Sequence, residues 1–180
     1  MKATGIVRRI DDLGRIVIPK EIRRTLRIRE GDPLEIFTDR EGKVILKKYS
    51  PIGELGSLAG IYADSLSKTL DCTVCITDTD QVIAAAGNGK KELQEMLLSA
   101  ELAEVFQQRK TVLTKSSDAE FVAITKDRSE YSEEIISVIL SEGDIAGGVI
   151  FLQKNEKKHF GEMEKKFAAG AADLLGRQLS

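Results

Sequence analysis

The stretch that most constrains the fold runs from Thr4 to Leu26, where cationic side chains lie among apolar residues that alternate as they do in β-strands. A compact, strand-rich scaffold with a cationic cluster is the electrostatic signature of a protein that binds nucleic acid. The stretch therefore predicts a small β-rich unit that binds nucleic acid. Its cations are Arg8, Arg9, Arg15, Lys20, Arg23 and Arg24, with Lys2 and Arg27 on either side.

The formal net charge of −2 hides two halves of opposite sign. Residues 1–50 hold 13 basic and 8 acidic side chains, a balance of +5, whereas residues 51–180 hold 14 basic and 21 acidic ones, a balance of −7. Two halves of opposite charge indicate two domains with different partners. The chain has neither the apolar core of a signal peptide nor an apolar run of membrane-spanning length, so we expect a cytoplasmic, nucleoid-associated protein with no membrane partner.

The first fifty residues predict four short strands and one short helix. Gly14 allows a tight turn after the first strand, and Pro19 suits the first turn of the helix. So small a unit without a metal or a disulfide usually needs a second copy to complete its core, which predicts a homodimer of intertwined strands. The strands are expected at Lys2–Ile10, Arg15–Ile18, Leu34–Thr38 and Val44–Lys48, and the helix at Lys20–Leu26.

The ordered string TGIVRRIDDLGRIVIPKEIRRTLRI, followed by GDPLEIF and VILKKY, resembles the DNA-binding domain of the AbrB family of bacterial transition-state regulators. The resemblance implies a swapped-hairpin β-barrel dimer in which arginines of the turn and the short helix meet DNA. Arginine suits that role because its planar guanidinium matches phosphates and guanine edges. The residues that the resemblance assigns to DNA are Arg8, Arg15, Arg23 and Arg24, with Arg9 and Lys2 as auxiliaries.

After a short linker that contains proline and glycine, the remaining residues predict one antiparallel sheet with helices packed on it. We therefore expect an α+β chain with a DNA-binding domain at 1–50, a linker at 51–54 and a second domain at 55–180. The order of elements in the second domain resembles a GAF domain, a small-molecule sensor or dimeriser. Helices are expected at Glu54–Leu70, Lys91–Gln108 and Gly161–Leu179, and strands at Cys72–Thr77, Gln81–Ala86, Val112–Lys115, Phe121–Thr125, Ile135–Ser141 and Ala146–Gln153.

Two roles stay open for the GAF-like domain. It either binds a small-molecule effector between the sheet and the elements that cover one face, or it serves oligomerisation alone. The signatures of nucleotide-binding and chromophore-binding relatives are missing, so no cofactor is expected. The amphipathic helices at Glu54–Leu70 and Gly161–Leu179 have two open roles. They form contacts between subunits and give a tetramer built from two dimers, or each covers its own sheet.

No catalytic or metal-binding constellation is evident. Cys72 and Cys75 have redox spacing, but they lie in a strand-like run where residues three apart face opposite ways, so we expect buried thiols. A zinc site needs two more ligands, and His159 is the sole histidine. We expect His159 to cap a helix or lie at the surface, and Gly147 and Gly148 to form a bulge or a close contact.

These features together resemble a family of sporulation regulators in spore-forming bacteria. The resemblance implies a sequence-selective regulator that activates and represses late genes of the forespore, modulated through its GAF-like domain. One alternative is a DNA-binding antitoxin of a toxin–antitoxin pair, because similar N-terminal domains occur there, although residues 54–180 look globular rather than disordered. The other is an enzyme in the second domain, which the missing acid–base and metal clusters disfavour.

Overall fold

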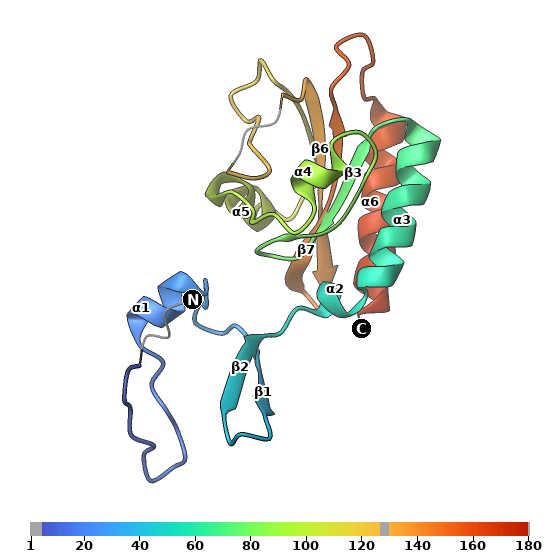
Figure 1. Cartoon of the computed structure of the whole chain (residues 1–180). Helices are drawn as coiled ribbons and strands as arrows, with labels where there is room; N and C mark the ends of the chain where they lie inside the picture. The colour runs from blue at the N-terminus through green and yellow to red at the C-terminus, as the bar shows by residue number, and fades with distance from the viewer. Residues whose placement is uncertain (1–4, 127–129, 180) are drawn as a thin grey trace. The chain divides into compact units, whose positions relative to one another are not determined.

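The computed structural model of the chain describes residues 5–126 and 130–179 and divides into two compact units, residues 1–49 and 50–180 (Figure 1). Within the described residues, no helix combines the length and the apolar character that crossing a membrane requires. The two units are considered separately below.

The N-terminal unit contains α1 (Lys20–Thr25) and an antiparallel hairpin of β1 (Leu34–Thr38) and β2 (Val44–Lys48). Leu34 pairs with Lys48 and Thr38 with Val44, as the alternating pattern predicts. The Asp39 carboxylate fixes the turn by accepting hydrogen bonds of 2.9 Å from the amides of Glu41 and Lys43. The predicted hairpin and the predicted short helix are confirmed.

The predicted strands at Lys2–Ile10 and Arg15–Ile18 do not appear as strands in the single chain. Residues 5–10 and 15–18 have no ladder partner among the described residues, and residues 2–4 lie outside the description. An isolated two-stranded pairing is marginal in water, and a strand needs a neighbouring edge to form. These two predictions came from alternation alone, and the single chain offers their described residues no neighbouring edge.

The C-terminal unit is a five-stranded antiparallel sheet between two helical layers (Figure 1). The strand order is β4-β3-β7-β6-β5. On one face, α3 (Gly56–Leu70) and α6 (Glu162–Gln178) pack through small side chains such as Ala59, Ala63, Ala168 and Ala172. The other face is covered by α4 (Lys90–Leu93) and α5 (Ala100–Gln107). The strands are β3 (Thr73–Thr77), β4 (Val82–Ala86), β5 (Val112–Lys115), β6 (Glu133–Ser141) and β7 (Asp144–Gln153).

Two elements of this unit were predicted wrongly. The expected helix Lys91–Gln108 is broken into α4 and α5, because the chain between them returns to the edge of the sheet. There the amide of Leu98 donates 2.8 Å to the Asp80 carbonyl, and the Ser99 hydroxyl accepts from the Leu102 amide to begin α5. The expected strand Phe121–Thr125 is irregular, with one isolated bridge from Thr125 to Leu98.

Residues 51–54, where a linker was expected, form the short helix α2 (Pro51–Glu54) of the C-terminal unit. Ile52 is fully buried in the core of this unit. The Ser50 hydroxyl donates 2.8 Å to the Asp78 carboxylate in the β3–β4 turn and accepts from the Gly53 amide. The start of the second unit is therefore anchored to its sheet.

Gly147 and Gly148 lie where the register between β6 and β7 shifts by one residue, as the prediction of a bulge or a close contact requires. A Cβ at Gly147 would overlap the Thr77 carbonyl oxygen, and a Cβ at Gly148 would lie 2.7 Å from the Phe106 ring. The glycine pair lets the sheet and α5 approach closely.

Candidate nucleic-acid interface

The turn that holds Arg15 is built around the carboxylate of Asp11. One oxygen accepts from the amides of Leu13 at 3.1 Å and Arg15 at 2.8 Å, and the other accepts from the Arg15 guanidinium at 2.9 Å. The amide and side chain of Arg15 together lower the pKa of Asp11. Gly14, at φ +77, supplies the left-handed step. This network holds the backbone of Arg15 in place, while 71% of its side chain stays exposed.

The helix α1 holds Arg23 and Arg24 in its last turn. Pro19 precedes the helix with φ −55, and its carbonyl accepts from the Arg23 amide at 3.0 Å. The Arg23 guanidinium donates 3.2 Å to the Ile18 carbonyl, which turns this side chain back toward the start of the helix. Neighbouring positions on a helix do not face the same way, so Arg24 is expected to leave the helix in another direction.

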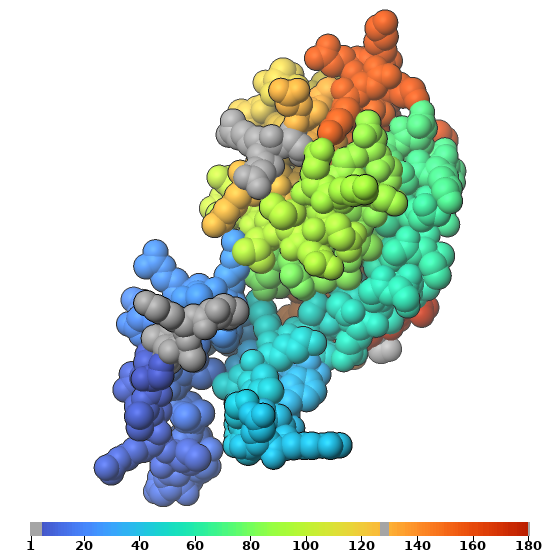
Figure 2. Space-filling view, in the orientation of Figure 1, coloured from blue at the N-terminus to red at the C-terminus, as the bar shows by residue number. Residues whose placement is uncertain are grey.

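All five described candidates are exposed: Arg8, Arg9, Arg15, Arg23 and Arg24. Arg8 and Arg9 belong to the segment before the turn, whose residues 5–10 are all exposed and which is dark blue in Figure 2. Lys2, the sixth candidate, lies outside the described residues. The structure thus brings the five arginines into one unit, on the turn, the segment before it and α1.

The same unit exposes an unusual amount of apolar surface. No residue of α1 is buried, and large apolar side chains elsewhere in the unit are between 39% and 91% exposed. So many exposed large apolar side chains in so small a unit indicate an interface with another chain. These side chains are Ile6, Val7, Ile10, Leu13, Ile16, Val17, Leu26, Ile36, Phe37, Val44 and Ile45.

The two cysteines behave as the strand geometry predicts. Both thiols are free and buried, with Cys72 in the core on the α3–α6 side of the sheet and Cys75 in the core on the α5 side. Burial raises the pKa of each thiol to about 12, which keeps both protonated and unreactive at neutral pH. In the described part of the chain, no group of three or more potential metal ligands comes together.

His159 lies just before α6, and its side chain is 63% exposed. Its Nδ1 lies 2.6 Å from the buried carboxylate of Glu133, which also accepts 2.7 Å from the Phe160 amide. Burial opposes ionisation of Glu133, but these bonds prevail and lower its pKa. His159 therefore anchors the segment that leads into α6 and lies largely at the surface, one of the two positions expected for it.

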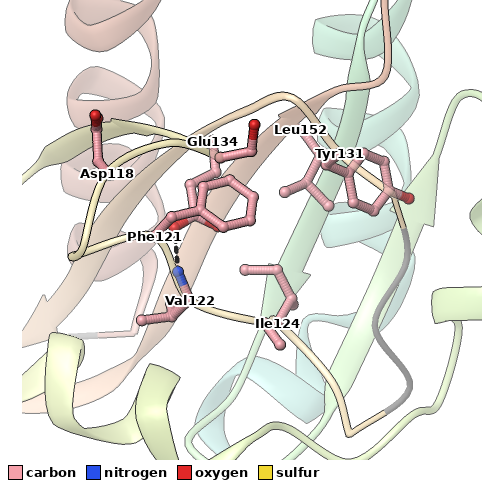
Figure 3. Close-up of a pocket in the computed structure, with 9 residues that line it drawn as sticks. Asp118, Phe121, Val122, Ile124, Tyr131, Glu134 and Leu152 are labelled. Atoms are coloured by element: carbon pink, nitrogen blue, oxygen red, sulfur yellow. Dashed lines mark hydrogen bonds between the residues drawn. The ribbon is translucent and has the colours of Figure 1, made fainter.

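Sequence reasoning missed a second feature, a pocket of about 320 Å³ beside β6 in the C-terminal unit (Figure 3). It is bounded by the irregular segment 116–124, and the fully buried Glu134 is one of the residues that line it. The signal in the sequence was a pair of glutamates that opens the apolar run IISVIL.

The two units also differ in the known proteins that they match. Residues 54–180 match the model of the stage V sporulation protein T C-terminal domain, described as a transcription factor. Over 183 aligned residues, the chain is 51% identical to stage V sporulation protein T of Bacillus subtilis, covering 99% of each chain. The chain belongs to the stage V sporulation protein T family of transcription factors. It is accordingly a sporulation transcription regulator, and this is not a family of enzymes.

The N-terminal unit has its own relatives. Over 51 residues it is 67% identical to the transition state regulatory protein AbrB of Bacillus subtilis, which covers 28% of this chain and 52% of AbrB. The AbrB-like character of the unit, predicted from the string beginning at Thr4, is confirmed. Residues 7–54 also match the model of the bacterial antitoxin MazE. The antitoxin alternative accounts for that segment alone, whereas the stage V sporulation protein T family accounts for the whole chain.

The fold of the C-terminal unit is that of a GAF domain. The GAF domain of a phosphoenolpyruvate-protein phosphotransferase from Acinetobacter superposes with a TM-score of 0.57 at 14% identity, covering 69% of this chain and 81% of that one. At this identity the similarity concerns the fold alone, and it confirms the predicted antiparallel sheet with flanking helices.

Proposed function

We propose that this regulator binds double-stranded DNA as an intertwined homodimer and, on the nucleoid in the cytoplasm, both activates and represses late genes of the forespore. The proposal gives sequence-selective DNA contact to a defined set of N-terminal side chains. They are Arg8, Arg9, Arg15, Arg23 and Arg24, together with Lys2.

One observation carries the proposal: exposed arginines and exposed apolar side chains share the N-terminal unit. Burial of the apolar side chains against a second copy would leave the cations of both copies on one small particle. The residue balance of +5 per chain in residues 1–50 would double in that dimer. Such a particle attracts DNA by releasing counterions from the phosphates.

The same proposal assigns α3 and α6 to the contact between dimers. Met163, Phe167 and Leu174 follow one stripe along α6 and are 61%, 43% and 41% exposed, and Ile61 on α3 is 62% exposed. The side of α6 that faces its own sheet is formed instead by Ala168, Ala172 and Leu175, which are buried in the core. The stripe that remains is suited to a helical bundle, and hence to a tetramer.

We further propose that a small-molecule effector in the C-terminal unit modulates DNA binding. The bond from Ser50 to Asp78 supports this, because it ties the first residue of the C-terminal unit to the β3–β4 turn. Asp80 of that turn accepts from Leu98, which bridges to Thr125 beside the pocket-lining segment. A ligand that favours one arrangement of these elements would shift the population of DNA-binding states.

The test is DNA affinity as a function of salt for the full chain and for Arg15→Ala and Arg23→Ala. Each lost phosphate contact lowers the log–log slope by about one, so each substitution would lower it by about two in a symmetric dimer. Arg177→Ala, an exposed arginine on α6 paired with Asp173, serves as the matched control. A slope equal to wild type in both variants, with equal affinity, would refute the DNA role of these arginines.

The modulation is tested by a flexible Gly/Ser insertion after Tyr49. If the two units are coupled through the joint, the insertion should abolish the effect of an effector on DNA affinity while the affinity itself persists. Unchanged regulation after the insertion would rule the coupling out.

A further inference from the structure

Glu134 occupies a position where an apolar side chain would be expected. It lies on β6 between Thr114 of β5 and Leu152 of β7, on the same sheet face as Ile136 and Val138. Its side chain is fully buried. A carboxyl group on an apolar sheet face is costly to bury, and such a group usually finds partners for both oxygens.

Only half of this carboxyl group is satisfied. Its Oε1 accepts 2.9 Å bonds from the Thr114 hydroxyl and the Val122 amide, and the latter is the dashed line in Figure 3. Its Oε2 is buried and has no hydrogen-bond partner among the described residues. Burial raises the pKa of Glu134 to about 7, although the bonds from Val122 and Thr114 act in the opposite direction.

The neighbouring Glu133 shows what a structural carboxylate looks like in the same strand. It faces the other side of the sheet, receives the Phe160 amide, contacts His159 and lies 3.7 Å from the Lys115 ammonium group. Each of its oxygens therefore has a partner, and its charge is compensated. Glu134 has no cation of that kind against it in the described structure, so its second oxygen needs another explanation.

The pocket beside Glu134 supplies one. Phe121, Ile124, Tyr131 and Leu152 give it apolar and aromatic walls. Asp118 lines it from the exposed segment, with its carboxylate pointing away from Glu134 and accepting 2.8 Å from the Lys115 amide (Figure 3). No basic side chain lines it among the described residues. A volume of about 320 Å³ is at the small end of the range for ligand pockets. The walls and the carboxyl groups disfavour phosphates and carboxylates and favour a nitrogen donor.

We propose that this pocket binds a small ligand that presents an amine or amide N–H to Oε2 of Glu134 and an apolar or aromatic portion to Phe121, Ile124 and Leu152. The proposal rests on the proposed effector role of the C-terminal unit and assigns that effector a chemical class. The segment 116–124 would close over the ligand, because the amide of Val122 already binds the other oxygen of the same carboxyl group.

The test uses benzylamine as the probe, with benzoate and benzyl alcohol as matched aromatic controls, in calorimetric titrations of the full chain. Benzylamine should bind once per chain, at least tenfold more tightly than benzoate. Glu134→Gln should weaken benzylamine at least tenfold, whereas Glu120→Gln, an exposed carboxylate of the same segment that does not line the pocket, should leave it unchanged. In amide NMR spectra of the wild type, benzylamine should shift the Val122 resonance.

Equal or tighter binding of benzoate, full affinity in Glu134→Gln, absent benzylamine binding, or a Val122 resonance that does not move would each overturn the proposal. The comparison of probes and the Val122 resonance use the wild type, so the test survives a variant that fails to fold. DNA affinity is measured on the same samples. Benzylamine binding without any change in DNA affinity would keep the site and refute its regulatory role. Normal DNA binding without benzylamine binding would refute the site and leave the proposed DNA-binding function standing.

Discussion

Glu134 should make the stability of the chain depend on pH in a direction opposite to that of most carboxylates. Its pKa is raised from 4.5 to about 7 in the folded protein, mainly by burial. Between these two values the folded chain holds a proton that the unfolded chain has released, so the free energy of unfolding falls as pH rises through the interval. The two pKa values correspond to a loss of about 3 kcal/mol per chain, fully developed above pH 7.

The assay is urea unfolding of the full chain between pH 4.5 and 8, for wild type and Glu134→Gln, followed by circular dichroism. Glutamine keeps an oxygen for Thr114 and Val122 and does not titrate, so the difference between the variants isolates this carboxyl group. Near pH 4.5 the two should be equal within about 1 kcal/mol, the net value of a typical hydrogen bond. Between pH 4.5 and pH 8, the free energy of unfolding of Glu134→Gln should rise by about 3 kcal/mol relative to that of the wild type. A difference between the two proteins that stays constant over this range, or that changes as much in Glu120→Gln, would refute the reasoning.

Three further outcomes follow from packing. Gly147→Ala would drive a Cβ into a backbone carbonyl, so it should lower the free energy of unfolding by about 3 kcal/mol or more. Gly60→Ala, at a position in α3 with open space around it, should instead raise the free energy of unfolding by about 0.5–1 kcal/mol. Cys72 and Cys75 should resist a thiol reagent at pH 8 in the native protein and react fully in urea, since burial holds each pKa near 12. If the native protein were modified as fast as an exposed thiol, this prediction would be contradicted. Phe167→Asp, on the exposed stripe of α6, should leave dimers but no tetramers in sedimentation, and a tetramer that persists would place the contact elsewhere.

Local sequence patterns predicted much of this fold because local forces decide those elements. The hairpin of β1 and β2 alternates cleanly, and α6 is a long amphipathic run, so both were predicted within a residue or two of their bounds. The opposite faces of Cys72 and Cys75 followed from strand geometry alone. The AbrB-like string identified the N-terminal unit because its order of residues is distinctive.

The failures came where long-range contacts override local preference. Residues 91–108 have helical spacing, yet Leu98 pairs with the distant Thr125 and interrupts the helix. Periodicity alone also does not separate the exposed Phe167 from the buried Ala168, because an exposed apolar stripe and a buried one look alike in sequence. The pocket at Glu134 was missed for the same reason: the partners of that carboxyl group come from β5 and from an irregular segment, and no local pattern brings them together.

The exposed apolar side chains of the N-terminal unit bear on how the regulator accumulates in a cell. If that unit is complete only when two chains meet, its formation is a second-order reaction. The C-terminal unit of a newly made chain then folds before the N-terminal unit, which folds only on dimerisation. Below the dimer dissociation constant, the amount of dimer rises with the square of the chain concentration. A twofold rise in chain concentration would then raise the concentration of the DNA-binding dimer by about fourfold, so the assembly step makes gene control more sensitive to the amount of protein.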